Sequence, residues 1–139
     1  MMSVDVALLK KQRSTVISGM SNSRQQISIL SDKISRLQAA SSNLQSSIAE
    51  LETSKNNINN LSIDNSKWEG SKENKFSNHY SDYRTSLRDY LQSVNDAKEG
   101  IDEEIRRLEQ SKAGYMKGLG NLESTLSSLN NQISRAESR

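Results

Sequence analysis

The stretch ISILSDKISRLQAASSNLQSSIAELETSKNNI, residues 27–58, decides the fold that the sequence predicts. Its frame positions alternate at spacings of three and four residues, which is the heptad pattern of a helix that packs on another helix. These positions are Ile27, Leu30, Ile34, Leu37, Ser41, Leu44, Ile48, Leu51, Lys55 and Ile58. The same frame extends back to Val6, with Arg13 and Ser23 as polar interruptions. We therefore expect one helix over residues 3–58.

A second stripe of the same kind begins at Phe76 and continues to Ile133. Its members are Phe76, Tyr80, Tyr83, Leu87, Leu91, Val94, Ile101, Ile105, Leu108, Tyr115, Leu119, Leu122, Leu126, Leu129 and Ile133. Two stripes of similar length predict an all-α fold, a long antiparallel two-helix hairpin that resembles a coiled coil. We expect a single domain over residues 1–139, with arm 1 at 3–58, a loop at 59–75 and arm 2 at 76–137.

The chain reversal falls in the segment between the stripes, which is rich in Asn, Ser and Asp. These residue types compete for backbone hydrogen bonds and favour caps and turns. A turn near residue 68 predicts that facing positions sum to about 136–140. Residues 24–36, which carry more basic than acidic side chains, would then face the acidic residues of 96–109.

Four of the six glycines fall at one level of this expected hairpin. They are Gly19 in the first arm and Gly114, Gly118 and Gly120 in the second. Each glycine inside a helix costs up to about 1 kcal/mol relative to alanine, so this level should be the weakest. We take these residues as a candidate hinge or a close-packed contact between the arms, and simple tolerance of glycine there is the alternative.

Composition limits the function classes. The chain has 139 residues, of which only 32% are of the types AVILMFWYC, and it has no cysteine and one histidine. It cannot build a thick core, a disulfide or a histidine–cysteine zinc site, and we expect no cofactor. The net charge is +2, with acidic and basic residues interleaved, which does not suggest nucleic-acid binding. The longest apolar run, residues 6–9, predicts neither a membrane span nor a signal peptide, so we expect a cytoplasmic protein.

The only tryptophan, Trp68, and Gly70 form a W-x-G tripeptide in the expected loop. At this position, between two helices of a small proline-free chain, the tripeptide resembles that of the WXG superfamily, helical hairpins handled by type VII secretion. The structural alternative is that Trp68 only packs the loop onto the end of the hairpin. The superfamily's export signal, Y-x-x-x-D/E after the second helix, has no match at any of the four tyrosines.

The missing export signal and the long arms resemble the YwqH-like accessory proteins of LXG toxins in Gram-positive bacteria. The resemblance implies a chaperone-like protein that binds the helical N-terminal domain of a toxin and assists its targeting. It also implies that co-export without a cleavable signal peptide is an alternative to a purely cytoplasmic location.

Other candidate sites have simpler interpretations. His79, with Asp82 nearby, lacks a third catalytic group, and the run from Asp102 to Arg107 has the i, i+4 charge spacing of an exposed helix. The four tyrosines lie on or beside the apolar stripe, which favours core or interface positions over a platform for stacking bases. We therefore expect no enzyme and no metal site.

A two-helix hairpin of this length should gain stability from further helices, so the sequence predicts a partner. Our hypothesis is a non-enzymatic interaction module that binds a toxin's helical domain, with a sister helical protein or a second copy as further partners. The expected contact residues are Ile27, Leu30, Ile34, Leu37, Leu44, Ile48, Leu51, Leu87, Leu91, Ile101, Ile105 and Leu108. Two alternatives remain, a secreted WXG-type effector that acts by itself and an unrelated homodimeric scaffold.

Overall fold

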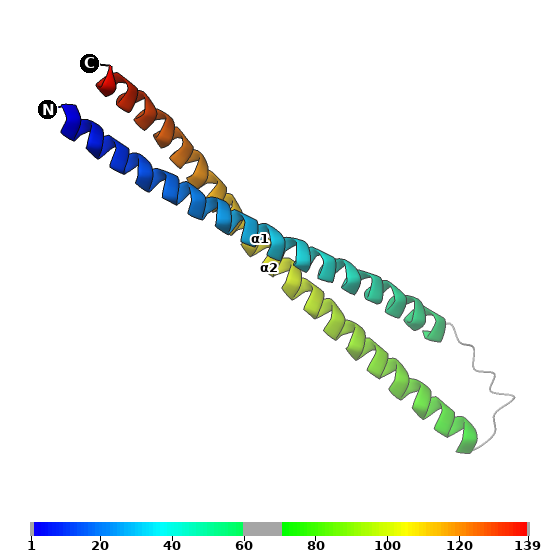
Figure 1. The fold of residues 1–139 in the computed structure, drawn as a ribbon. Coiled ribbons are helices and arrows are strands. Elements are labelled where there is room, and N and C mark those ends of the chain that lie inside the picture. The colour runs from blue at the N-terminus through cyan, green and yellow to red at the C-terminus, as the bar shows by residue number, and fades with distance from the viewer. Residues whose placement is uncertain (1, 60–70, 139) are drawn as a thin grey trace. The chain divides into compact units, whose positions relative to one another are not determined.

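The computed structural model describes residues 2–59 and 71–138, with side chains described over 5–58 and 78–138. The chain is an all-α helical hairpin of two helices, α1 (Met2–Asn59) and α2 (Ser71–Glu137) (Figure 1). Asp5 lies in the first turn of α1 and Arg135 in the last turn of α2, where each charge is favourable for the helix dipole. The expected fold class is therefore confirmed, while the loop with Trp68 and Gly70 lies outside the described residues.

The start of α2 differs from the expected start of the second arm. The helix begins at Ser71, five residues before the predicted boundary at residue 76. The residues gained are SKENK, in which lysine and glutamate have high helix propensity and no glycine or proline interrupts them. The apolar pattern starts only at Phe76, so periodicity alone placed the boundary too late.

The helices form two compact units. The terminal unit contains Met1–Arg36 and Ile105–Arg139, and the central unit contains Leu37–Glu104. Each unit is a pair of helical segments, one from α1 and one from α2. The expectation that the chain is one domain stays a prediction.

The terminal unit packs an apolar seam between its two antiparallel segments. Among the side chains described in this unit, the buried apolar ones are Met20, Leu30 and Ile34 from α1, and Leu129 and Ile133 from α2. Ser23, one of the polar interruptions in the heptad frame, is also buried, at 8% exposure. The chain termini lie in this unit, where Lys10 forms a 2.9 Å ion pair with Glu137.

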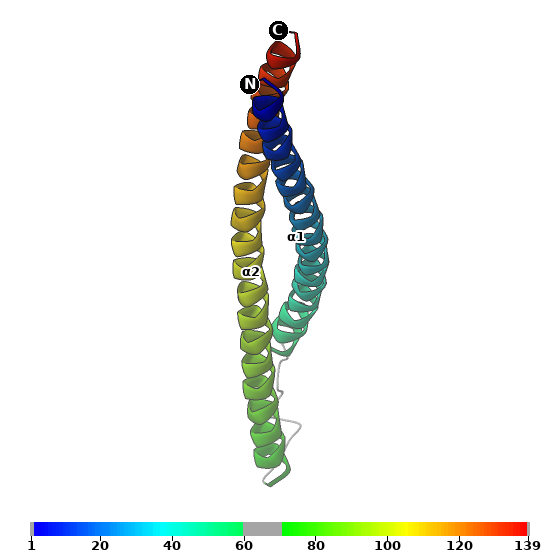
Figure 2. The ribbon, with the colours of Figure 1, turned by 60° about the vertical axis from the view of Figure 1, so that its left-hand side comes forward.

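In the central unit, two apolar side chains are buried among the described residues. These are Ile48 of α1 and Leu91 of α2, with 3% and 7% exposure. At one end of the unit, the Tyr80 hydroxyl donates a hydrogen bond to the carbonyl oxygen of Ile58. The first turns of α2 therefore extend past the C-terminal end of α1 (Figure 2).

The side-chain contacts between the helices join other residues than the facing positions that the sequence predicts. The residue numbers of the contacting pairs have sums between 138 and 147. The sum is 147 for Lys10–Glu137 and Arg24–Glu123, and 143 for Arg13–Asn130 and Ser41–Asp102. It is 141 for Gly19–Leu122 and 138 for Ile58–Tyr80. Only the last lies in the predicted range of 136–140. Side chains lean toward the N-terminus of their own helix, so contacts across an antiparallel pair join residues with larger sums than directly facing Cα atoms.

The charge pairing predicted from that register is also wrong for the arginines of residues 24–36. Arg24 lies 3.8 Å from Glu123, outside the acidic segment 96–109. Arg36 forms a 3.0 Å ion pair with Asp32 of its own helix. Both arginines are well exposed, so these pairs contribute little to stability.

Candidate functional site

The twelve residues predicted to contact a partner all lie on the faces where the helices of each unit meet. Four of them are buried, namely Leu30, Ile34, Ile48 and Leu91. The other eight are half-buried, namely Ile27, Leu37, Leu44, Leu51, Leu87, Ile101, Ile105 and Leu108. The twelve thus hold the hairpin together, and the half-buried eight keep accessible surface. Their contact with a partner stays a prediction.

The candidate hinge glycines lie inside continuous helix. A Cβ atom on Gly19 would approach Cδ1 of Leu122 to 3.3 Å, so this glycine permits a close contact between the two segments. A Cβ atom on Gly114, Gly118 or Gly120 would meet no atom within 4 Å. Packing therefore accounts for the glycine at position 19 alone, and the hinge stays a prediction.

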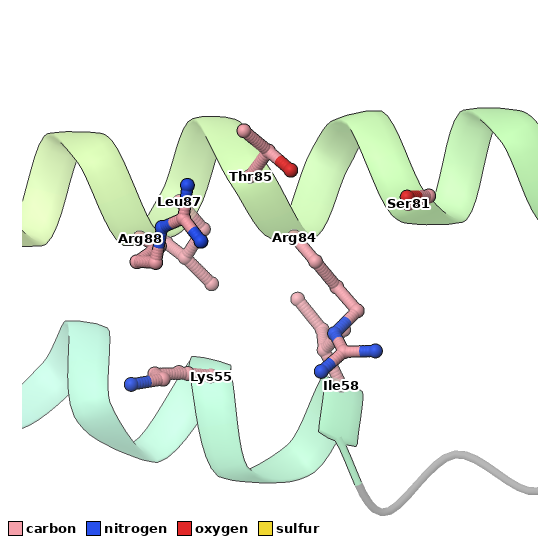
Figure 3. A pocket seen from close by; sticks show the side chains of 7 residues that line it. All are labelled: Lys55, Ile58, Ser81, Arg84, Thr85, Leu87 and Arg88. Atoms are coloured by element: carbon pink, nitrogen blue, oxygen red, sulfur yellow. The ribbon is translucent and has the colours of Figure 1, made fainter.

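The C-terminal end of α1 is held by side chains of α2. Besides the hydrogen bond from Tyr80 to the carbonyl of Ile58, the Arg84 guanidinium lies 5.6 Å from the centre of the Tyr80 ring. Figure 3 shows the Arg84 side chain reaching from α2 toward Ile58. The last turn of α1 has no basic residue of its own, so Arg84 supplies the positive charge that the C-terminus of a helix favours.

Beside this contact the central unit has a hollow of about 150 Å³, which we call the cationic groove (Figure 3). It is lined by Lys55, Ile58, Ser81, Arg84, Thr85, Leu87 and Arg88. Three of these residues are cationic, two carry hydroxyl groups and two are apolar. The groove therefore offers positive charge around a small apolar surface.

The charges of the cationic groove are only weakly compensated. Among the described residues, neither Lys55 nor Arg84 has a carboxylate within ion-pair distance. Arg88 lies 3.5 Å from Asp89, with both side chains 68% exposed, which is a weak surface pair. The local charge of the groove is therefore positive although the whole chain has a net charge of only +2.

A second surface of the central unit carries exposed tyrosines. Tyr83 and Tyr90 are 58% and 60% exposed and lie seven residues apart, on one side of α2. Tyr115, in the terminal unit, is 38% exposed. These three tyrosines are therefore not core residues, and the interface role expected for them stays a prediction. Over residues 5–58 and 78–138, the other exposed large apolar side chains are Leu8, Ile17, Ile29 and Met116.

The described residues include no group of three His, Cys, Asp or Glu side chains that could hold a metal ion. His79 and Asp82 are both exposed.

Asp102, in the charged run of the second helix, has partners on both helices. It forms an ion pair with Lys98, whose Nζ donates a 2.8 Å hydrogen bond to it, and it accepts a 2.6 Å hydrogen bond from Ser41. In the part of the chain that the structure describes, neither helix has an apolar stretch long enough to span a membrane.

The cationic groove was not predicted from the sequence. Lys55 and Arg84 come from different helices, and only the register of the hairpin brings them together. One signal for the groove was present in the second helix, the i, i+4 spacing of Arg84 and Arg88. The i, i+7 spacing of Tyr83 and Tyr90 was a signal for the surface with exposed tyrosines. Both spacings place like side chains on one side of a helix. The motif residues Trp68 and Gly70 lie outside the described residues.

Comparison with known proteins identifies a family. A family model described as YwqH-like matches residues 11–131, most of both helices and the segment between them. No curated protein and no solved structure matches the chain.

Proposed function

The chain belongs to the YwqH-like family, and on this premise we propose that it is a non-enzymatic accessory protein that binds the helical N-terminal domain of an LXG-type toxin. In this role it keeps the toxin domain soluble and helps target it to type VII secretion. A sister helical protein is a further partner in this proposal. Trp68 and Gly70 would form part of the surface that the secretion machinery reads.

The observation that supports this proposal is the incomplete core of the hairpin. Even Ile48, the most buried apolar residue among those described, keeps 3% exposure, and no described side chain is completely buried. Most of the heptad positions are half-buried. When a further helix covers such a surface, each Å² of apolar area that it buries stabilises the complex by about 25 cal/mol.

A helical partner fits this surface better than a compact one. The half-buried residues follow each helix at heptad spacing, so within each unit they form narrow strips along the helices. A helix laid in the groove between two helices contacts such a strip over many turns. A toxin domain built from long helices presents the matching geometry.

The test is affinity purification of the tagged protein from its own host under mild conditions. The recovered complex is identified by mass spectrometry, and its mass is measured by light scattering. We expect a stoichiometric complex with a larger protein that has a helical N-terminal region. Recovery of a self-paired dimer alone would replace the proposal by a homodimeric scaffold. Recovery of a monomer from the culture medium would favour an effector that acts by itself.

A further inference from the structure

We propose that the cationic groove is the docking site for a partner helix that presents acidic side chains beside an apolar one. This inference rests on the proposed accessory function and makes it specific. It names the place on the hairpin where the partner is recognised and the chemistry of the partner's contacting residues.

The size of the groove favours a protein side chain as its occupant. A volume of about 150 Å³ accommodates one side chain of medium size, whereas sites for cofactors and similar ligands usually occupy 300–1,000 Å³. Ile58 and Leu87 are half-buried at this site, so they provide an apolar surface for that side chain. The groove is therefore suited to a single apolar residue of a larger partner.

The positive charge of the groove favours acidic residues of the partner on either side of this apolar contact. Lys55 approaches the groove from α1, and Arg84 and Arg88 approach it from α2 (Figure 3). Among the described residues, Lys55 and Arg84 have no ion-pair partner, and only Arg88 has a nearby carboxylate, that of Asp89. A carboxylate from outside would face cations on two sides, and arginine can bind it with two parallel hydrogen bonds.

These two requirements define the partner's sequence pattern. On a helix, residues three and four positions apart share one face. A partner helix with Asp or Glu three or four residues before and after a Leu, Ile or Met would place carboxylates near Lys55 and Arg84 while the apolar residue enters the groove. Complementary charge of this kind fixes the orientation and register of the bound helix.

The first test is carbodiimide cross-linking of the complex purified from the host, which joins an amine to a carboxylate at contact distance. We expect an amide between the Lys55 Nζ and an Asp or Glu of the partner, and no such link from Lys33, an exposed lysine of the terminal unit. A link from Lys55 to Asp64 or Glu69 of its own chain would show that the loop fills the groove. Either that link or no link from Lys55 would overturn the proposal.

The second test measures recovery of the same partner by variants. The variant Lys55→Glu, Arg84→Glu, Arg88→Glu is compared with Lys11→Glu, Lys33→Glu, Lys117→Glu, which changes the net charge equally at exposed lysines of the terminal unit. We expect the groove variant to recover about ten-fold less partner and the control to recover the wild-type amount. If charge reversal unfolds the groove variant, as judged by circular dichroism, the glutamine substitutions at the same three positions replace it.

The remaining outcomes separate the two proposals. Equal recovery by the groove variant and the wild type would overturn this inference and leave the accessory function standing. Failure of the wild-type protein to recover any protein partner would overturn both. A groove variant that no longer self-associates but still binds the partner would assign the groove to a second copy of the chain. Tight binding of inorganic phosphate to the free wild-type groove, measured by NMR, would assign it to a small anion.

Discussion

Ser41 of α1 donates a 2.6 Å hydrogen bond to Oδ1 of Asp102 in α2, and the two residues lie 61 positions apart. The other oxygen of Asp102 accepts a 2.8 Å hydrogen bond from Lys98, one turn earlier in α2. All three side chains are half-buried at the seam of the central unit. The hydroxyl and the carboxylate can form this hydrogen bond in only one register of the two helices. The cluster therefore specifies how the two segments of the unit align.

The first prediction concerns this register contact. Ser41→Ala removes a hydrogen bond to a partly buried carboxylate, which should lower the free energy of unfolding by about 1 kcal/mol. Alanine has a higher helix propensity than serine, which offsets part of the loss. The matched control is Ser42→Ala, because Ser42 is exposed on the same helix and gains the same propensity. Urea denaturation of both variants measures the difference. Equal stability of the two would show that the contact does not contribute.

The second prediction concerns the end of α1. Tyr80→Phe removes the hydroxyl that donates to the carbonyl of Ile58, and this should cost about 1 kcal/mol of local stability. The last turn of α1 should fray, so hydrogen exchange should become faster at the amides of residues 55–58. Tyr90→Phe serves as the control, because the Tyr90 side chain is 60% exposed. Unchanged exchange rates in Tyr80→Phe would mean that the hydroxyl does not hold this turn.

The helices were predictable because a heptad stripe depends only on residues close in sequence. Leu30, Ile34 and Ile48 are frame positions in the first stripe, and all three are buried. The seam between two helices is narrower than the apolar stripe, however. Tyr83 belongs to the second stripe by spacing, yet it is 58% exposed because the two helices meet on the side of α2 that carries Leu91.

The alignment of the helices was not predictable from the same pattern. Sliding one helix by a heptad leaves apolar positions facing apolar positions, so the stripe alone accepts several registers. The contacts that decide among them join distant residues, such as Ser41 with Asp102 and Lys10 with Glu137. The cationic groove depends on this register, and this is why the sequence did not show that Lys55 of one helix lies beside Arg84 of the other.

The third prediction concerns the glycines of the terminal unit. Alanine at positions 114, 118 and 120 should raise the free energy of unfolding by about 0.5–1 kcal/mol at each site, because the new methyl groups meet no atom within 4 Å. Gly19→Ala should gain less, since Leu122 must shift by a few tenths of an ångström. Gly100→Ala is the control for helix propensity alone, because its site is equally open but lies in the central unit. It should give a similar gain in the free energy of unfolding.

Urea denaturation checks these values, and a lower stability of the triple variant would contradict them. The same variant tests the candidate hinge. A hinge that must bend to admit a partner should work poorly when alanine stiffens it, so recovery of the partner from the host should fall. A triple variant that is more stable and still recovers the wild-type amount of partner would show that the glycines are only tolerated.

The last prediction concerns the W-x-G tripeptide. The double substitution Trp68→Ala, Gly70→Ala should abolish secretion of the co-expressed partner and leave both proteins bound to each other. The reason is a division of roles, in which the helix surfaces supply affinity and the tripeptide supplies part of the surface read by the secretion machinery. The measurement compares the partner in the medium with the complex recovered from cells. Ser66→Ala, Lys67→Ala is the matched control in the same segment. Unchanged secretion from an intact complex would refute the signalling role, and loss of the complex itself would assign Trp68 to binding.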